Sequence, residues 1–392
     1  MTATLVLKAG KDRPLLRRHP WVFAGAIERQ QGRAEPGDTV RVVGADGRFL
    51  AWAAYSPAST IRARAWSFRE RDAVDAALIE RRIVQAITRR AELERDTDAV
   101  RLIFGEADGL PGLVADRYAR QLVVQLLSAG AERWRDAIVA ALGRAAGCDA
   151  IYERSEAAVR EREGLAPREG PIDGAVPAPV EIVEHGLRYR VDVVRGHKTG
   201  FYIDQRDNRA RVAAMAAGRR VLNCFAYTGG FTVAALAGGA VSAVSVDSSA
   251  DALAAAREHV ARNGLQAAAA EWVEADVFAL LRQLHGAQRR FDLIVLDPPK
   301  FAPSPQHVER AARAYKEINL KALQLLAPGG LLFTFSCSGA IGIELFQKIV
   351  AGAVFDAGVD AQLLQRLQAG IDHPVAMTHP EGEYLKGLLL RV

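Results

Sequence analysis

The chain contains 392 residues, of which 50% are hydrophobic and 25% are charged, a composition typical of a globular protein with two or three domains. It has neither an apolar signal core near its amino terminus nor a run of about 18 apolar residues, which argues against the secreted and membrane classes and predicts a cytoplasmic protein. Its three cysteines and scattered histidines show no paired spacing, so neither a disulfide framework nor a metal site is predicted.

Basic charge is concentrated in the first 71 residues. This segment contains 13 Lys and Arg against 6 Asp and Glu, a net charge of +7, whereas the whole chain carries +5. Arg17 and Arg18 precede the aromatic Trp21, a mixture that suits contacts to the phosphates of RNA. A solvated basic face would account for the charge equally well. Short strands separated by turns between residues 38 and 67 predict a small β-barrel.

The middle of the chain alternates helical and strand patterns. Residues 72–95 have one apolar stripe at helical spacing, and strands followed by an amphipathic helix are predicted over 102–146, which is an α+β pattern. Residues 160–179 are rich in Pro, Gly and charge and predict a surface excursion. Two strands around the His185-Gly186 turn then lead into a further domain. The predicted domains are residues 1–71, 72–179 and 180–392.

The segment 221–247 has the pattern of one half of a nucleotide-binding sheet: a strand, a glycine-containing turn at 223–230, an apolar helix and a second strand ending in Asp247. Asp247 lies about 20 residues beyond the turn, where its carboxylate can accept hydrogen bonds from ribose hydroxyls. The turn lacks the three-glycine fingerprint that approaches a pyrophosphate, and S-adenosylmethionine (SAM) has no pyrophosphate. The pattern therefore predicts a Rossmann-like α/β sheet with a nucleoside cofactor.

Three acidic residues follow predicted strands: Asp247, Asp276 and Asp297. Because ligands bind outside the carboxyl ends of the strands in an open parallel sheet, all three are expected to face one crevice. Each of them alone would also fit a helix N-cap or a solvated loop. Together they favour a ligand site.

Cys337 follows the buried strand predicted at 331–335 and stands between two serines. The same sheet geometry places it at the mouth of the crevice, beside the loop that begins at Asp297. Most cysteines are buried and inert, but polar neighbours at a strand end make Cys337 a candidate nucleophile. Cys224, inside the first turn, is expected to be a small packing residue.

Four strings of the sequence resemble the bacterial ribosomal RNA large subunit methyltransferase I family. They are LDPPKF at 296–301, FTFSCSG at 333–339, HKTGFYIDQRDNR at 197–209 and YLKG at 384–387. The resemblance covers essentially the whole chain, and the string at 197–209 is highly specific.

The resemblance implies a C-terminal class I methyltransferase domain with a seven-stranded Rossmann-like sheet, a central α+β domain and an N-terminal PUA-like RNA-binding barrel. It implies SAM-dependent methylation of C5 of a cytosine in 23S rRNA, either naked or in an assembling large subunit. It also implies that the Cys337 thiolate adds to C6 of the base, while Asp297 contacts N3 or the amino group. A homodimer is compatible with these expectations.

The expected site residues fall into three groups. The catalytic residues are Cys337 and Asp297. The cofactor contacts are Phe201, Asn223, Phe225, Tyr227, Thr228, Gly229, Asp247, Ser248, Asp276, Val277 and Asp297. The substrate contacts are Lys198, Pro298, Lys300, Arg17 and Arg18.

Two other functions stay open. An RNA methyltransferase acting on an exocyclic amine, guanine N2 or adenine N6, would use an Asp/Asn-Pro-Pro-aromatic loop without a cysteine, but Lys300 occupies the aromatic position. A non-catalytic RNA-binding factor in ribosome assembly would keep the fold alone, and the presence of the three acids together with Cys337 argues against it.

Overall fold

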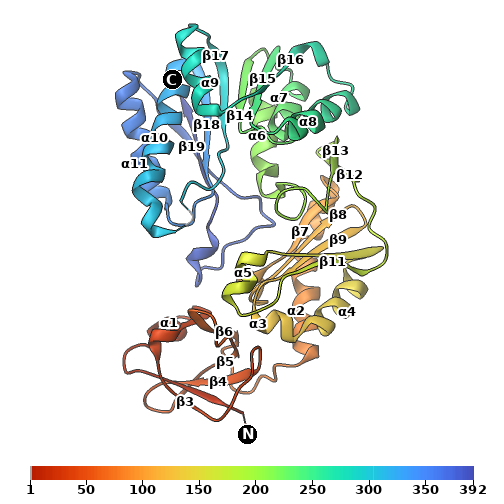
Figure 1. The fold of residues 1–392 in the computed structure, drawn as a ribbon, viewed down its shortest axis with the longest axis vertical. Helices are drawn as coiled ribbons and strands as arrows, with labels where there is room; N and C mark the ends of the chain where they lie inside the picture. The colour runs from red at the N-terminus through yellow and green to blue at the C-terminus, as the bar shows by residue number, and fades with distance from the viewer. Residues whose placement is uncertain (1, 303) are drawn as a thin grey trace. The chain divides into compact units, whose positions relative to one another are not determined.

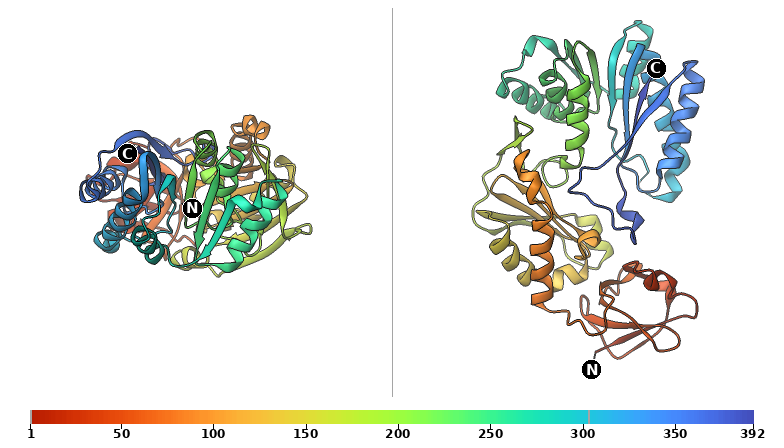
Figure 2. Two further views of the ribbon diagram at one scale, coloured as in Figure 1. Left: turned by 90° about the horizontal axis from the view of Figure 1, so that it is seen from above. Right: turned by 180° about the vertical axis from the view of Figure 1, so that it is seen from behind.

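The computed structural model describes residues 2–302 and 304–392, and its backbone contacts divide it into two compact units of three segments each. Figures 1 and 2 show their helices and strands coloured along the chain. Unit 1 comprises Met1–Glu184, Val191–Ile203 and Ile371–Gly382. Unit 2 comprises His185–Arg190, Asp204–Gly370 and Glu383–Val392.

Unit 1 begins with a six-stranded sheet of order β2-β6-β5-β4-β1-β3. Its elements are β1 (Thr4–Leu7), α1 (Arg13–Leu16), β2 (Trp21–Phe23), β3 (Ile27–Gln31), β4 (Thr39–Val43), β5 (Phe49–Tyr55) and β6 (Ile61–Ser67). Alternating side chains such as Val40, Val42, Ala51 and Ala53 are buried in one core, as half-buried strands require. The strands β4, β5 and β6 match the predicted ones. The strand β3 escaped prediction because most of its side chains are exposed and polar.

A second sheet of unit 1 has the order β11-β10-β9-β8-β7. The elements are α2 (Ala76–Thr88), β7 (Ala99–Phe104), β8 (Leu113–Tyr118), β9 (Gln121–Leu126), α3 (Ala129–Arg133), α4 (Arg135–Ala145), β10 (Ala150–Ser155), α5 (Ala157–Arg162) and β11 (Arg168–Asp173). The strand β11 lies where a surface excursion was predicted. It pairs with β10 but contains Gly170 and Pro171 and alternates little, which hid it from the sequence pattern. β12 (Val180–Glu184) and β13 (Leu187–Val191) flank the His185-Gly186 turn as predicted.

Unit 2 contains a seven-stranded sheet of order β16-β15-β14-β17-β18-β20-β19. Its elements are α6 (Arg206–Met215), β14 (Arg220–Cys224), α7 (Gly230–Ala237), β15 (Ser242–Asp247), α8 (Ala250–Arg262), β16 (Ala270–Glu274), α9 (Val277–Gly286), β17 (Phe291–Leu296), α10 (Val308–Leu325), β18 (Leu326–Ser336), α11 (Ile343–Ala357), β19 (Gln362–Gln368) and β20 (Lys386–Arg391). The first five strands are parallel, and β20 and β19 are antiparallel to their neighbours. The predicted Rossmann-like α/β sheet is confirmed.

Helices cover both faces of this sheet, because its strands are apolar on each side. On one face Leu222 of β14 packs into the core that includes α9, α10 and α11, and Figure 1 shows α10 and α11 side by side. On the other face the next residue, Asn223, contacts Thr232 of α7. Helices on the two faces leave the carboxyl ends of the parallel strands to be closed by loops.

Candidate active site

The carboxyl edge of the parallel strands gathers the predicted acids and cysteine of unit 2. β15 ends in Asp247, β17 is followed by Asp297, and β18 is followed by Cys337. Asp276 follows β16, the neighbour of β15. Since these strands are parallel neighbours, the shared edge predicted from the sequence is confirmed.

The loop between β14 and α7 owes its shape to backbone in the left-handed region. Phe225, Tyr227 and Gly229 have φ of 60°, 46° and 74°. A Cβ added at Gly229 would lie 2.7 Å from the Cβ of Ala256 on α8, closer than two side-chain carbons approach. Glycine is therefore required at this position twice, by its conformation and by the close approach of α8.

Asp247 ties this loop to the end of β15. Its Oδ2 accepts the backbone N–H of Tyr227 at 2.8 Å, and its Oδ1 accepts that of Ser249 at 3.0 Å. A carboxylate can accept about four hydrogen bonds, so these two contacts orient Asp247 without using its whole capacity. The half-buried carboxylate therefore fits the role of an acceptor for ribose hydroxyls.

His259 on α8 holds the loop between β14 and α7 through a hydrogen bond. The sequence analysis did not single out this residue. Its Nδ1 donates to the carbonyl of Thr228 at 2.8 Å, and its Nε2 accepts the N–H of Arg190 at 2.9 Å. The ring is fully buried, and this burial lowers the pKa of His259. A lone histidine within an alanine-rich helix carries no sequence signal for this contact, because Thr228 is 31 residues away.

Four other predicted cofactor residues differ in their surroundings. Asn223 is buried, and its amide donates to the hydroxyl of Thr232 at 2.9 Å. Asp276 is the N-cap of α9 and accepts the N–H of Ala279 at 2.9 Å. Val277 is buried in the sheet core, and Ser248 is exposed. A cofactor contact for each of these four stays a prediction.

Cys337 lies against the loop that follows β17. Its Sγ is 3.8 Å from the carbonyl oxygen of Pro298, and its side chain is partly exposed. Pro298 is buried, whereas Lys300 of the same loop is exposed. The sequence-based placement of Cys337 beside the Asp297 loop is therefore confirmed.

The other two thiols have different surroundings. Cys224 is fully buried in the sheet core, and burial strongly raises the pKa of its thiol. Cys148 belongs to unit 1, where partial burial also raises the pKa of its thiol. Cys224 ends β14 and so lies at the same edge, but of the three thiols only that of Cys337 is both at the carboxyl edge of the unit 2 sheet and partly exposed.

Buried polar side chains support the loop that carries Cys337. The hydroxyl of Ser336 donates to Tyr315 Oη at 3.0 Å, and Tyr315 Oη lies 3.1 Å from Ser338 Oγ. The ammonium of Lys386 on β20 donates to the carbonyl of Ser338 at 2.9 Å. Burial raises the pKa of Tyr315 and lowers that of Lys386. The sequence analysis assigned no role to either residue, since neither is adjacent to Cys337 in the chain.

Lys198 and Phe201 belong to unit 1, as do Arg17 and Arg18. Phe201 is buried, and its backbone N–H donates to Tyr118 Oη at 3.2 Å. The Lys198 Nζ lies 4.3 Å from the centre of the Tyr202 ring, a cation–π distance. Arg17 and Arg18 are exposed. Contacts of these four with cofactor or RNA stay predictions.

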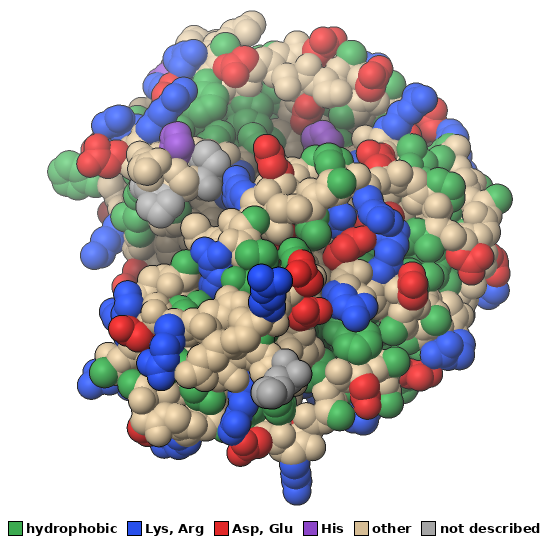
Figure 3. Space-filling view, turned by 60° about the horizontal axis from the view of Figure 1, so that its bottom comes forward, with side chains coloured by type: hydrophobic (Ala, Val, Ile, Leu, Met, Phe, Trp, Pro, Cys, Tyr) green, Lys and Arg blue, Asp and Glu red, His purple; other side chains and the backbone are tan. Residues whose placement is uncertain are grey.

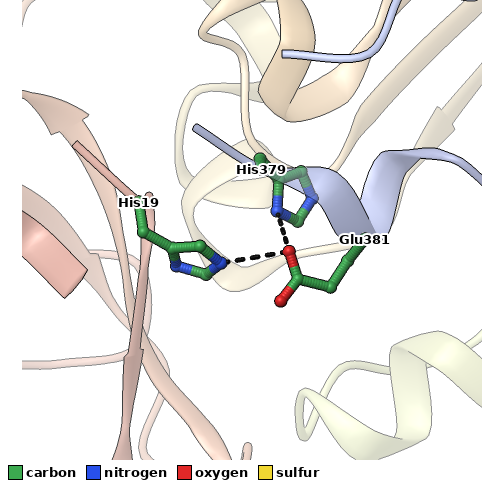
Figure 4. A group of neighbouring side chains, drawn as sticks. All are labelled: His19, His379 and Glu381. Carbon is green, nitrogen blue, oxygen red and sulfur yellow. Dashed lines mark hydrogen bonds and ion pairs between the residues drawn. The ribbon is translucent and has the colours of Figure 1, made fainter. Parts of the chain in front are cut away.

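Unit 1 also contains a cluster with metal-ligand chemistry, formed by His19, His379 and Glu381 (Figure 4). His19 Nε2 and His379 Nδ1 lie 3.1 and 3.0 Å from the same carboxylate oxygen of Glu381. The N–H of Trp21 donates to His19 Nδ1 at 3.2 Å, so the proton of a neutral His19 is on Nε2 and faces Glu381. A hydrogen bond therefore joins His19 to Glu381, whereas His379 lies at ion-pair distance from the same oxygen. His19 is 362 residues from Glu381, so the sequence pattern does not bring the three together.

Charge on the surface of Figure 3 is mixed. Lys and Arg side chains alternate there with Asp and Glu and do not gather in one patch. Among the described residues, no helix combines the length and the apolar character needed to cross a bilayer.

Comparison with known proteins agrees with this geometry. A family model of S-adenosylmethionine-dependent methyltransferases matches residues 172–375, and a model of PUA-like domains matches residues 5–68. A solved structure described as a SAM-dependent methyltransferase from Streptococcus mutans superposes with a TM-score of 0.86 at 23% identity, covering 100% of both chains. A methyltransferase solved in complex with SAH gives 0.88 at 23% identity, again covering 100% of both chains. These two likenesses concern the fold.

The relatives in sequence are more similar. Proteins named "Ribosomal RNA large subunit methyltransferase I" share 51% identity in Klebsiella pneumoniae (strain 342), over 99% of this chain and 98% of theirs, and 49% in Citrobacter koseri, over 100% of both. The predicted PUA-like domain, methyltransferase domain and cofactor are thereby confirmed. Because these full-length relatives and the methyltransferase model match it, the chain belongs to the ribosomal RNA large subunit methyltransferase I family of SAM-dependent methyltransferases.

Proposed function

We propose that the protein methylates C5 of a specific cytosine in 23S rRNA and that Cys337 is the nucleophile. The names of its full-length relatives support the ribosomal RNA substrate. The position of Cys337 supports the covalent chemistry, because its sulfur lies 3.8 Å from Pro298 O at the ligand edge of the sheet. That position is the observation that carries the proposal.

C5 of cytosine is a weak nucleophile, and a thiolate changes this. The electron pair of the Cys337 sulfur forms a bond to C6, and C5 becomes an enamine-like carbon that can accept a methyl group. SAM supplies that group as an electrophilic methyl on a sulfonium. Loss of the C5 proton then restores the C5–C6 double bond, and the sulfur leaves C6 as a thiolate.

Asp297 and the adjoining prolines have a separate task in this proposal. The half-buried carboxylate of Asp297, at the end of β17, would contact N3 or the amino group of the cytosine as charge develops on the ring. Pro298 and Pro299 hold this loop in an extended form that cannot continue as a helix. The loop and Cys337 would thus meet the base from two neighbouring strands.

RNA binding is assigned to the PUA-like domain. Its first 71 residues carry a net charge of +7, and Arg17 and Arg18 are exposed there. Phosphate contacts of this type position an RNA without reading its sequence. In this proposal residues 1–71 bind RNA and residues 180–392 carry out the methyl transfer. The central domain, residues 72–179, helps to shape the cleft in which the RNA binds.

A mechanism-based trap tests the proposal. RNA with 5-fluorocytosine at the target position should form a gel-stable adduct in the presence of SAM, because fluorine cannot leave C5 as a proton does. Cys337→Ala should lose both adduct and methylation while keeping its affinity for SAM. Cys148→Ala removes a partly exposed thiol of unit 1 and should keep the adduct. Full methylation by Cys337→Ala would overturn the mechanism and favour an exocyclic-amine methyltransferase.

A further inference from the structure

Lys386 is a buried cation beneath the loop that carries Cys337. Its side chain is 2% exposed, and its backbone pairs with Ser336 in the β18–β20 ladder. The ammonium donates to two carbonyl oxygens, those of Ser338 at 2.9 Å and Tyr384 at 2.7 Å. The Lys386 side chain therefore links the antiparallel strand β20 to the carbonyl of Ser338, the residue that follows Cys337.

Burial of this ammonium is costly unless its charge is compensated. Neutral carbonyl groups supply hydrogen bonds but no net negative charge, and a buried cation normally requires an anionic partner. Burial lowers the pKa of Lys386, and interaction with Cys337 and with Glu383 opposes that shift. Glu383 is exposed to solvent, so its charge is screened. Cys337, the residue before Ser338, is a group whose ionised form would supply the anion on the buried side.

We infer that Lys386 is a positioning residue, which fixes the Ser336–Ser338 loop through the Ser338 carbonyl and favours the thiolate form of Cys337. A role of Lys386 in RNA methylation rests on the proposed function. Its effect on the ionisation of the Cys337 thiol does not. The Lys386 ammonium contacts the carbonyl of the residue that follows Cys337, and a nearby opposite charge favours the ionised form of a group by about one to three pH units. A free thiol ionises near pH 8.5, so a shift of one unit raises the thiolate fraction at pH 7 about tenfold.

Other charged groups around Cys337 act in both directions. Lys300 on the facing loop is exposed, and its positive charge adds to that of Lys386. Asp297 begins that loop, and the ionised form of its carboxyl group would oppose the thiolate. The Tyr315 hydroxyl bonds to Ser336 and Ser338, and its pKa is raised mainly by burial, so it stays neutral. Lys386 differs from Lys300 in its burial, which protects its charge from screening by salt.

Alkylation of the native, full-length protein tests the inference without RNA or methyl transfer. Iodoacetamide labelling of Cys337 is followed by peptide mass spectrometry from pH 6 to pH 10, with Cys148 as an internal reference. In the wild-type protein we expect a labelling midpoint for Cys337 below pH 8.5 that changes little between 0.05 and 0.5 M salt. A midpoint at or above pH 8.5 would overturn the inference, whatever the variants do.

Two matched variants identify the source of the charge. Lys386→Gln should slow labelling of Cys337 at pH 7 about tenfold and raise its midpoint, while labelling of Cys148 is unchanged. Lys348→Gln removes the same charge from an exposed site on α11 and should leave both rates as in the wild type. Melting temperature and SAM affinity verify that Lys386→Gln is folded. If Lys386→Gln is folded and the labelling midpoint of Cys337 equals that of the wild type, Lys386 has a structural role only.

The result is separable from that of the covalent trap. If the fluorocytosine adduct fails to form but the labelling midpoint is low and depends on Lys386, the proposed chemistry fails and the pairing of Lys386 with Cys337 stands. If the adduct forms and the midpoint is ordinary, the chemistry stands and the role of Lys386 fails.

Discussion

The carboxyl edge of the unit 2 sheet is built in two different ways. On the side of β14 and β15, the loop at 225–229 is shaped by left-handed backbone and by N–H groups that converge on Asp247. On the side of β17 and β18, the loop around Cys337 rests on buried side chains, Tyr315 and Lys386. One side is organised by the main chain and the other by side-chain chemistry.

This difference matches the tasks proposed for the two sides, cofactor binding at the first and nucleophilic attack at the second. Close approach of a backbone to a cofactor requires small residues and unusual φ angles, and a single acid completes it. Control of a reactive thiol requires charge and hydrogen bonds at fixed positions, which the side chains of Lys386 and Tyr315 supply around Cys337. The first arrangement should thus be sensitive to shape, and the second to the loss of single polar atoms.

The sharpest test of shape is Gly229→Ala. The new Cβ would lie 2.7 Å from the Ala256 Cβ at a φ of 74°, so we expect a loss of about 3 kcal/mol in the free energy of unfolding and at least tenfold weaker SAM binding. Gly264→Ala is the control, because Gly264 has a φ of 63° and no atom within 4 Å of its added Cβ. It should cost about 1 kcal/mol. Equal losses in urea unfolding would show that crowding is irrelevant.

Loss of one polar atom on the other side is tested by Tyr315→Phe. The change leaves Ser336 and Ser338 without their shared buried partner, and we expect about 2 kcal/mol of destabilisation. Urea unfolding of Tyr315→Phe, Ser336→Ala and the double variant gives a cycle in which the combined loss should be smaller than the sum of the single losses. Strict additivity would contradict a shared network.

Asp247→Asn keeps the shape of the side chain at the end of β15 and removes the charge of its carboxylate. One of the two oxygens that accept N–H groups becomes an amide nitrogen, so we expect about tenfold weaker SAM binding by calorimetry. Asp251→Asn is the control, since Asp251 is exposed in the first turn of α8. Identical dissociation constants for the two variants would remove Asp247 from the cofactor site.

The smallest effect is expected from pH at His259. Burial lowers the pKa of His259 in the folded state, so the fold favours its neutral form. Its contribution to stability is present above pH 6.5, the ordinary value for histidine, and is lost as the pH falls below it. Unfolding of wild type and of His259→Gln between pH 8 and pH 5 should show a stability difference that shrinks toward low pH. A constant difference would contradict the assignment.

The contrast between a loop shaped by its main chain and a loop held by distant side chains also explains which residues could be predicted from the sequence. Gly229, Asp247 and Asp297 were predicted because strand, turn and acid follow one another within a few residues, and the order of parallel strands then brings them to one edge. Tyr315, Lys386 and His259 were not assigned roles, because each acts on a loop 20 to 50 residues away along the chain. The sheet register that makes these distant residues neighbours cannot be obtained from local patterns.

Strands without alternation were also missed. The strand β11 contains glycine and proline, and β19 has most of its side chains exposed, so neither shows the period of two that reveals a half-buried strand. Backbone pairing with β10 identifies β11 as a strand, and backbone pairing with β20 identifies β19.

The interleaved segments of the two units have a consequence for dissection of the protein. Because three segments of each unit alternate along the chain, the backbone passes from one unit to the other five times. The segment Ile371–Gly382 illustrates this: Asp372 accepts the N–H of Arg101 within unit 1, while the strands before and after it pair with each other in the unit 2 sheet. A single cut by a protease therefore cannot release either unit intact, and nicked protein should migrate as one species until a denaturant is added.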